Sequence, residues 1–221
     1  KDFFLLPQTL DRAALAAEVA RQGRLHAADP VLVGGYWPIA AFDISGPRKE
    51  DLDRAVADRP VILFDDSGHS QWVNSKALAV LGIDRDTADP VPGLSFFVRD
   101  AKGEPTGWVK ENALRPHLAK LGVGASLQKA ELQAFLDDLA SRGVVALFDA
   151  GNDQADEPLL AALAQLAASG QLPLRYDASV MITLPHQIAG AVARLERLRE
   201  KYAGGRLRIN TVKILLDGVS E

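Results

Sequence analysis

The sequence contains no cysteine, and this absence removes three kinds of chemistry. Disulfide bonds, catalytic thiolates and cysteine-ligated zinc sites are all excluded. The absence does not decide the compartment, because a reducing cytoplasm and an oxidising periplasm both permit a cysteine-free chain. We expect a cytoplasmic protein, and a periplasmic location stays open.

Long apolar runs and concentrated positive charge are also missing. Apolar runs such as GVVALF are far shorter than the ~20 residues that a membrane-spanning helix needs. The net charge is −4, and the basic residues are scattered among acidic ones, which is not typical of a surface that binds nucleic acid. We therefore expect neither membrane nor nucleic acid as a partner. A small-molecule substrate is the expected ligand, and a homodimer stays open.

What the sequence does contain is an alternation of apolar, strand-like runs with amphipathic helices. In the first half, helices are predicted over 9–23 and 76–81 and strands over 30–37, 60–64 and 94–100. After residue 125 the pattern becomes regular, with helices over 126–143, 156–170 and 184–202 and strands over 144–151, 172–182 and 207–218. Strands that alternate with helices favour an α/β fold with a parallel sheet.

Ionisable side chains lie near the ends of two of these later strands. Asp149 ends VVALFD, and Lys213 and Asp217 lie in VKILLDG. Because side chains alternate along a strand, Lys213 and Asp217 are expected on one face, opposite an apolar face. Ligands of parallel α/β folds bind at the carboxyl ends of the strands. A buried amine is more easily uncharged and reactive, so catalysis by Lys213 and an internal Lys213–Asp217 ion pair both stay open.

Four stretches of the chain carry recognisable motifs. The first is ADRPVILFDDSGHSQWVNSKALAVLGI, with Gly68, His69, Trp72 and an Asn-Ser-x-Ala-Leu run that starts at Asn74. The others follow in order: GEPTGWVKENAL with Glu111, RGVVALFDAG with Asp149, and VKILLDG with Lys213 and Asp217. Together these stretches resemble amidohydrolase family 3, the group that contains N-substituted formamide deformylases. Asp66 in the first stretch fits the family pattern only loosely.

This resemblance implies part of a (β/α)8 barrel that carries a metal-dependent hydrolase for C–N bonds other than peptide bonds. Residues 1–125 are then expected to form a region inserted after the first barrel strand and lying over the barrel mouth. Residues 126–221 are expected to supply about barrel strands two to four, within the same larger domain. Lys213 is implied as a carboxylated metal ligand, and the expected cofactor is one or two divalent ions, with zinc the first choice.

The resemblance also implies the roles of the other site residues. Asp149 and Asp217 are expected to join Lys213 in catalysis. Substrate contacts are expected from His69, Trp72, Asn74 and Glu111. Each of these four has a structural alternative: a histidine that bonds to nearby backbone, a core tryptophan, a helix N-cap and an acid in a first helical turn.

The resemblance also implies a His-x-His pair on the first barrel strand, as in the wider superfamily to which this family belongs, and the sequence departs from that pattern. It holds His26, His69, His117 and His186, with no His-x-His pair. We therefore expect a piece of a longer protein, inactive by itself, whose remaining ligands lie outside these residues. Two other functions stay open: a lyase in which Lys213 forms a Schiff base, and a non-catalytic α/β ligand-binding module.

Overall fold

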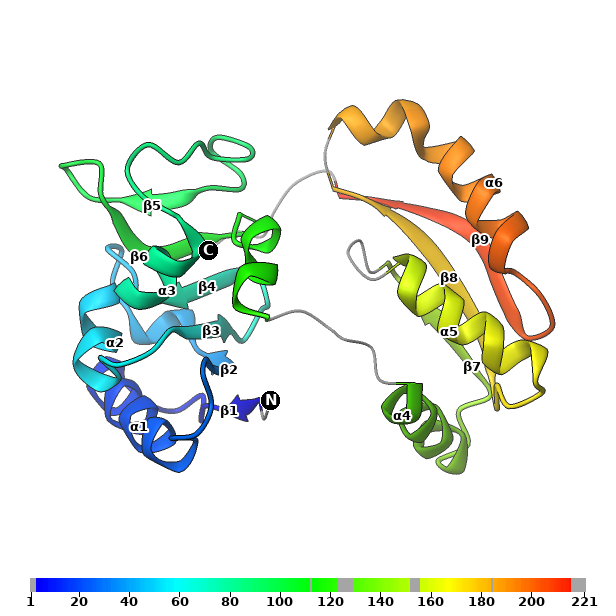
Figure 1. Ribbon diagram of the computed structural model, residues 1–221, viewed down its shortest axis with the longest axis horizontal. Coiled ribbons are helices and arrows are strands. Elements are labelled where there is room, and N and C mark those ends of the chain that lie inside the picture. The colour runs from blue at the N-terminus through cyan, green and yellow to red at the C-terminus, as the bar shows by residue number, and fades with distance from the viewer. Residues whose placement is uncertain (1–2, 112, 123–128, 152–155, 184, 216–221) are drawn as a thin grey trace. The chain divides into compact units, whose positions relative to one another are not determined.

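A computed structural model of the protein describes residues 3–111, 113–122, 129–151, 156–183 and 185–215 (Figure 1). The chain divides into two compact units, with the division between Gly124 and Ala125. Each unit has its own sheet, its own helices and its own apolar core. Within the described residues, no helix combines the length and the apolar composition that a membrane crossing requires.

The first unit is built on a six-stranded mixed sheet of order β1-β2-β3-β4-β6-β5. β1, β2 and β3 run parallel, whereas β4, β6 and β5 are joined in antiparallel pairs. The strands are β1 (Phe4–Leu5), β2 (Leu32–Trp37), β3 (Val61–Asp65), β4 (Ser70–Val73), β5 (Phe97–Arg99) and β6 (Pro105–Lys110). The helices are α1 (Arg12–Leu25), η1 (Ile39–Ala41), α2 (Lys49–Ala55), α3 (Ser75–Leu81) and η2 (Arg115–Leu121).

Apolar cores lie on both faces of this sheet. On one face, Leu15 and Val19 of α1 and Leu52 of α2 pack with Leu63 and Trp72. The opposite core combines residues of α3 and η2 with Ile62, Val73 and Val109. The sheet is therefore the middle of three layers, and β4 is buried along its whole length.

Several details of this unit differ from the sequence expectation: α1 starts later, and β1, α2, β4 and β6 were not predicted. α1 begins after Asp11, whose carboxylate accepts a hydrogen bond from the backbone of Ala14, and so it starts later than the expected residue 9. β6 was not predicted, because it begins with Pro105 and contains Gly107 at φ 93°. Both residues are ordinarily rare inside strands. The helix at α3 is confirmed, with Asn74 as N-cap and Gly82 in the left-handed conformation at its end.

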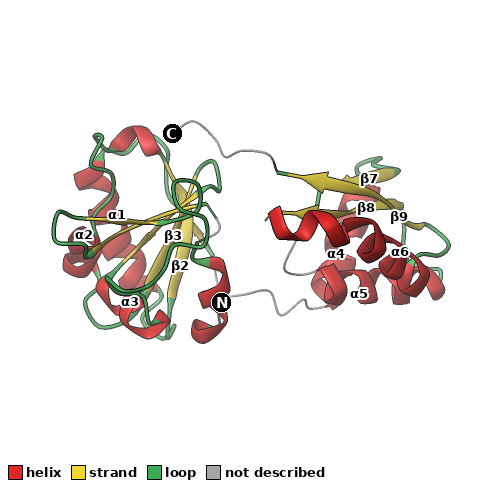
Figure 2. Ribbon diagram, turned by 90° about the horizontal axis from the view of Figure 1, so that it is seen from above, coloured by secondary structure: helices red, strands yellow, loops and turns green. Residues whose placement is uncertain are grey.

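The second unit is a three-stranded parallel sheet of order β7-β8-β9. The strands are β7 (Ala146–Asp149), β8 (Arg175–Ile182) and β9 (Leu207–Ile214), and the helices are α4 (Lys129–Ser141), α5 (Asp156–Ala168), η3 (Pro185–Gly190) and α6 (Ala191–Tyr202). Figure 2 shows the helices on one side of this sheet. Leucines of α4, α5 and α6 pack there against Tyr176, Ala178 and Val180 of β8. The alternating pattern thus produced the α/β unit that the sequence predicts.

Among the described residues of the second unit, no helix covers the other face of the three-stranded sheet (Figure 2). Phe148 on this face is 59% exposed, so β7 is not the fully buried strand that its apolar composition predicts. A register shift at Ala178/Ser179 skips Asn210 in the pairing with β9. Because of this shift, Ile209 and Val212 both lie toward the helices, and Lys213 lies toward the uncovered face.

Candidate functional site

Lys213 lies near the carboxyl end of β9, on the uncovered face of the sheet. Its register partner on β8 is Met181. The side chain is half-buried, and no hydrogen bond or ion pair to another described residue is found for it. The expected partner Asp217 lies outside the described residues, so the Lys213–Asp217 pair stays a prediction. The position at a strand's carboxyl end is the one at which parallel α/β folds bind ligands.

Asp149 lies on the opposite face of the same sheet. It pairs in register with Ala178, which is part of the helix-covered core. Its carboxylate accepts hydrogen bonds from the Tyr176 hydroxyl at 2.8 Å and from the backbone N–H of Gly151 at 3.0 Å. Burial, with the negative charge of Asp149 beside it, raises the pKa of Tyr176. The structure therefore does not bring Asp149 and Lys213 together, and it gives Asp149 a partner within its own unit.

The described residues do not by themselves complete a metal centre. No three His, Cys, Asp or Glu side chains among them lie close enough together to hold one ion. Lys213 is a candidate ligand without companions in this part of the chain. A zinc or other divalent site would need further ligands.

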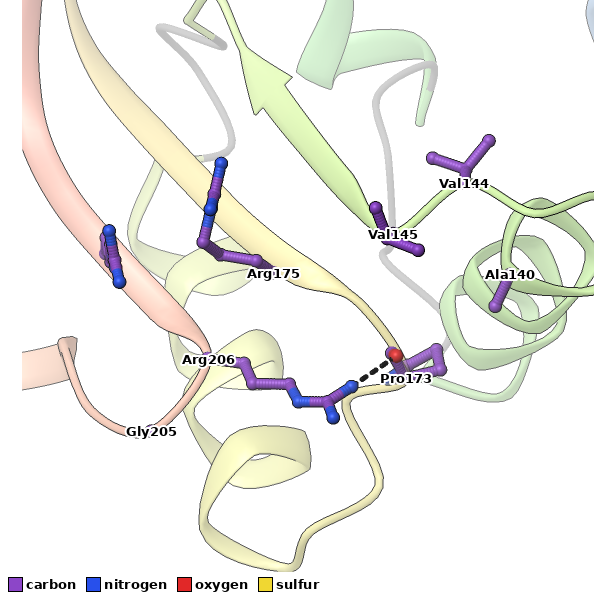
Figure 3. A pocket seen from close by; sticks show the side chains of 8 residues that line it. Ala140, Val144, Val145, Pro173, Arg175, Gly205 and Arg206 are labelled. Atoms are coloured by element: carbon purple, nitrogen blue, oxygen red, sulfur yellow. Dashed lines mark hydrogen bonds between the residues drawn. The ribbon is translucent and has the colours of Figure 1, made fainter.

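A hollow of about 430 Å³ lies at the other end of the three-stranded sheet, at the amino ends of the strands (Figure 3). Arg175, Arg206 and Arg208 line it. Arg206 donates to the Pro173 carbonyl, and Arg175 pairs with Asp177 at 2.8 Å. These contacts already hold two of the arginines, and ligands of parallel sheets bind at the opposite end. The hollow is therefore not at the ligand-binding end of this sheet.

His69 and Glu111 form a pair in the first unit. The Nδ1 atom of His69 lies 2.9 Å from Oε2 of Glu111, and the backbone N–H of Glu111 donates to the His69 carbonyl at 2.6 Å. His69 lies in the loop from β3 to β4, and Glu111 directly follows β6. Glu111 has φ 54°, which a non-glycine residue adopts rarely. Glu111 therefore does not lie in the first turn of a helix. His69 and Glu111, which belong to two separate sequence motifs, are in direct contact.

The loop that carries His69 is held by Asp65 at the end of β3. The Asp65 carboxylate accepts from the Ser70 backbone at 3.0 Å and from the Ser67 hydroxyl. The Ser67 oxygen in turn accepts from the backbone N–H of His69. Asp65 is 3% exposed. Through these bonds Asp65, the acid at the end of this buried strand, shapes the turn that carries His69.

Trp72 and Asn74 are both buried inside the first unit. The Trp72 ring is fully buried, stacks edge-on with Trp37 and Phe42, and donates its Nε1–H to the Arg48 carbonyl. This placement gives Trp72 a packing role, in contrast to the expected pocket wall. Asn74 is fully buried as well, and it bonds only to backbone, so a substrate contact does not fit its position either.

Four hydrogen bonds use both ends of the Asn74 amide. Its Oδ1 accepts from the backbone N–H groups of Val61 and Ala77, and its Nδ2 donates to the carbonyls of Val56 and Arg59. One residue thus caps α3 and ties it to the start of β3. This satisfies the bonding capacity that an asparagine amide has.

A small pocket next to the His69–Glu111 pair includes a residue that sequence reasoning missed. It holds about 160 Å³. Its side-chain lining is half apolar and half polar: Phe64, Leu114, Leu118, Gln71, Glu111 and Arg115. Gln71 is 5% exposed, and its Oε1 has no hydrogen-bond partner among the described residues. A polar residue on the apolar face of a buried strand was the available signal for Gln71. We call this cavity the Gln71 pocket.

Comparison with known proteins relates the sequence to one protein family. A sequence model described as amidohydrolase family matches residues 3–221. The exoenzymes regulatory protein AepA of Pectobacterium carotovorum subsp. carotovorum is 35% identical over 176 residues, which cover 79% of this chain and 37% of that protein. A Bacillus subtilis (strain 168) protein, provisionally named amidohydrolase YtcJ, is 33% identical over 196 residues, which cover 85% of this chain and 34% of that protein.

A shorter similarity and a solved structure complete the comparison. The N-substituted formamide deformylase of Arthrobacter pascens is 37% identical over 67 residues, 30% of this chain and 12% of that enzyme. The crystal structure of an uncharacterized metal-dependent hydrolase from Pyrococcus horikoshii OT3 has a similar fold, with a TM-score of 0.53 and 20% identity over 97% of this chain and 39% of that one. The chain spans about a third of the length of the first two relatives.

Proposed function

Because this chain belongs to the amidohydrolase family, we propose that it is part of a metal-dependent hydrolase acting on C–N bonds other than peptide bonds in small molecules. The similarity to an N-substituted formamide deformylase supports this bond type. The chain spans about a third of its longer relatives, so the proposal assigns most metal ligands to other parts of a parent protein.

The second unit supports a barrel-type site. Three parallel strands with helices on one face and an uncovered opposite face have the arrangement of a segment of a (β/α)8 barrel wall. We take the uncovered face as the barrel interior. Exposed Phe148 and half-buried Met181 lie on it, and their apolar surface is suited to burial inside a closed barrel.

The observation that carries the proposal is the position of Lys213. It is half-buried on that interior face, near the carboxyl end of a parallel strand. We propose that it is carboxylated and binds the metal, with zinc as the expected ion. A bound divalent ion would supply an activated water and would polarise the scissile carbonyl. Lys213 itself would hold the ion and would not take part in proton transfer.

The test uses the full-length parent protein and the variant Lys213→Ala. Loss of hydrolysis of N-substituted formamides together with loss of bound metal is the expected result, because a ligand is removed. A short carboxylic acid in solution should restore part of the activity by occupying the vacated carbamate position. The matched control is Lys201→Ala, which removes an exposed lysine on α6 that pairs with Glu157 and should leave both measurements unchanged.

Two results would contradict this assignment. If Lys213→Ala keeps normal metal content and turnover, Lys213 is not a ligand. If borohydride with substrate traps a covalent adduct on Lys213, the chemistry is that of a Schiff-base lyase, because a carboxylated lysine has no free amine to trap.

A further inference from the structure

Met181 lies beside Lys213 near the carboxyl end of the three-stranded sheet. The two residues are register partners on β8 and β9, so both side chains are on the uncovered face. Neighbouring strands are ~4.8 Å apart, and a molecule bound at Lys213 is therefore within reach of Met181. The pairing continues past both residues, because Ile214 pairs with Ile182 and the Leu215 N–H donates to the Ile182 carbonyl at 3.0 Å. Met181 and Lys213 are thus held on paired strands, which position a site more precisely than loops do.

Gly151 makes room for the Met181 side chain on the side of β7. It follows the end of that strand with φ 105°, a conformation that favours glycine. A Cβ atom added to Gly151 would lie 2.8 Å from Cβ, 3.3 Å from Cγ and 3.4 Å from Sδ of Met181. Carbon atoms pack at ~3.5–4.0 Å, so a larger residue would displace Met181. In the strand order β7-β8-β9, Met181 therefore lies between Gly151 and Lys213.

The Met181 side chain supplies an apolar surface next to the amine of Lys213. It is the one methionine of the chain, and it is partly exposed on this face. Methionine is unbranched and polarizable, and it adapts to apolar groups of different shapes. A ligand that matches both residues has a polar group at Lys213 and an apolar substituent directly beside that group.

We propose that Met181 is a specificity-determining residue, whose side chain contacts an alkyl substituent next to the hydrolysed C–N bond. This inference rests on the proposed function, which assigns the reaction to the site of Lys213. It adds the class of substrate: a small molecule with an uncharged alkyl group directly beside the scissile bond. A charged group at the same place would be desolvated against the thioether without a partner there.

The experiment measures kcat/KM of the full-length parent protein on two homologous series. N-methylformamide to N-butylformamide lengthens the group on nitrogen, and N-methylacetamide to N-methylpentanamide lengthens the group on the carbonyl. Met181→Ala should lower the ratio of the longest to the shortest homologue about tenfold in one series, because an apolar contact of this size is worth that much. The series that responds identifies the side of the bond that Met181 contacts.

Two further variants are controls for this ratio. Met181→Leu conserves volume and apolar character, and it should keep the ratio within about twofold. Phe148→Leu changes another apolar residue of the same face. The register partner of Phe148 is Asp177, four positions before Met181 on β8, which places it ~13 Å away along the strand. Phe148→Leu should therefore leave the ratio unchanged.

A second measurement needs neither turnover nor a cavity in the protein. In NMR spectra of the metal-free parent protein, the Met181 methyl signal is the one that disappears in Met181→Leu. The longest homologue of the responding series should shift this signal saturably, and the shortest should shift it less.

Three results would overturn the inference: unchanged ratios in Met181→Ala, an equal fall for all homologues as general destabilisation produces, or a methyl signal that does not respond. These results are distinct from failure of the proposed function. If Lys213→Ala abolishes hydrolysis while Met181→Ala leaves both ratios unchanged, only the role of Met181 is wrong. If Lys213→Ala keeps normal turnover, the assignment of the reaction to this site is wrong as well.

Discussion

Asp149 and Lys213 lie on opposite faces of the β7-β8-β9 sheet. Asp149 shares the face of Ala178, in the helix-covered core, and Lys213 shares the face of Met181. Both are ionisable residues near the carboxyl ends of parallel strands, and the family resemblance of the sequence implies joint catalysis. Their separation by the sheet predicts that substitutions at the two positions have independent effects.

The first prediction concerns the hydrogen bond between Tyr176 and Asp149. Tyr176→Phe leaves a carboxylate oxygen without its donor, and Asp149→Asn removes the charge. Each should lower the unfolding free energy of the second unit by about 1–2 kcal/mol. Denaturant unfolding followed by a probe in this unit measures the change.

The control for that prediction is the double variant. Because the two residues bond to each other, their combined effect should be smaller than the sum of the single effects. Additive losses would show that the 2.8 Å contact contributes no coupling. Neither variant should alter metal content of the parent protein, since neither side chain lies on the face of Lys213.

A second prediction follows from the raised pKa of Tyr176. Burial and the neighbouring Asp149 carboxylate both favour the neutral phenol. A raised folded-state pKa means that the stability contributed by this group is complete below pH ~10, the value of an unfolded tyrosine, and is lost as the pH rises further. Near-ultraviolet titration should show a late tyrosinate component, and Tyr176→Phe should abolish it. A titration identical in the two proteins would contradict the buried position.

A third prediction concerns Asn74. Asn74→Ala removes four bonds from a fully buried cap and should cost about 2–4 kcal/mol of stability. Asn74→Asp keeps the acceptor that caps α3 but loses the two donors, so its cost should be intermediate at neutral pH. Ser75→Ala, at an exposed neighbouring position, is the control and should cost less. Thermal unfolding of the first unit ranks the three variants.

The fourth prediction tests the loop that Asp65 shapes. Asp65→Ala removes the acceptor for the Ser70 backbone and the Ser67 hydroxyl, and it should release His69 from Glu111. The expected result is a His69 ring signal that moves toward that of a solvent-exposed histidine in NMR spectra. Asp66→Ala, one residue along and exposed, should leave the signal in place. An unchanged signal in Asp65→Ala would show that Glu111 alone orients the ring.

Much of the local structure is determined by the sequence itself. The alternation of apolar runs and amphipathic helices predicts the α/β class, because strand and helix periods differ along any buried face. Asn74 and Gly82 define α3, since a side-chain acceptor and a left-handed residue are the local requirements of helix ends. Lys213 is correctly placed opposite Val212, because the two-residue period of β9 is unbroken from Thr211 to Ile214.

Only the tertiary structure decided which of these residues meet. His69 and Glu111 are 42 positions apart and are joined because β4 and β6 pair across the sheet. Asp149 turns away from Lys213 because its register with β8 puts it over the helix-covered core, and the register shift that skips Asn210 could not be predicted from alternation. Gln71 lines a pocket together with Arg115 and Leu118 of η2, a grouping that depends on tertiary packing. Pairing, register and covering depend on contacts between distant segments, and a local pattern does not specify them.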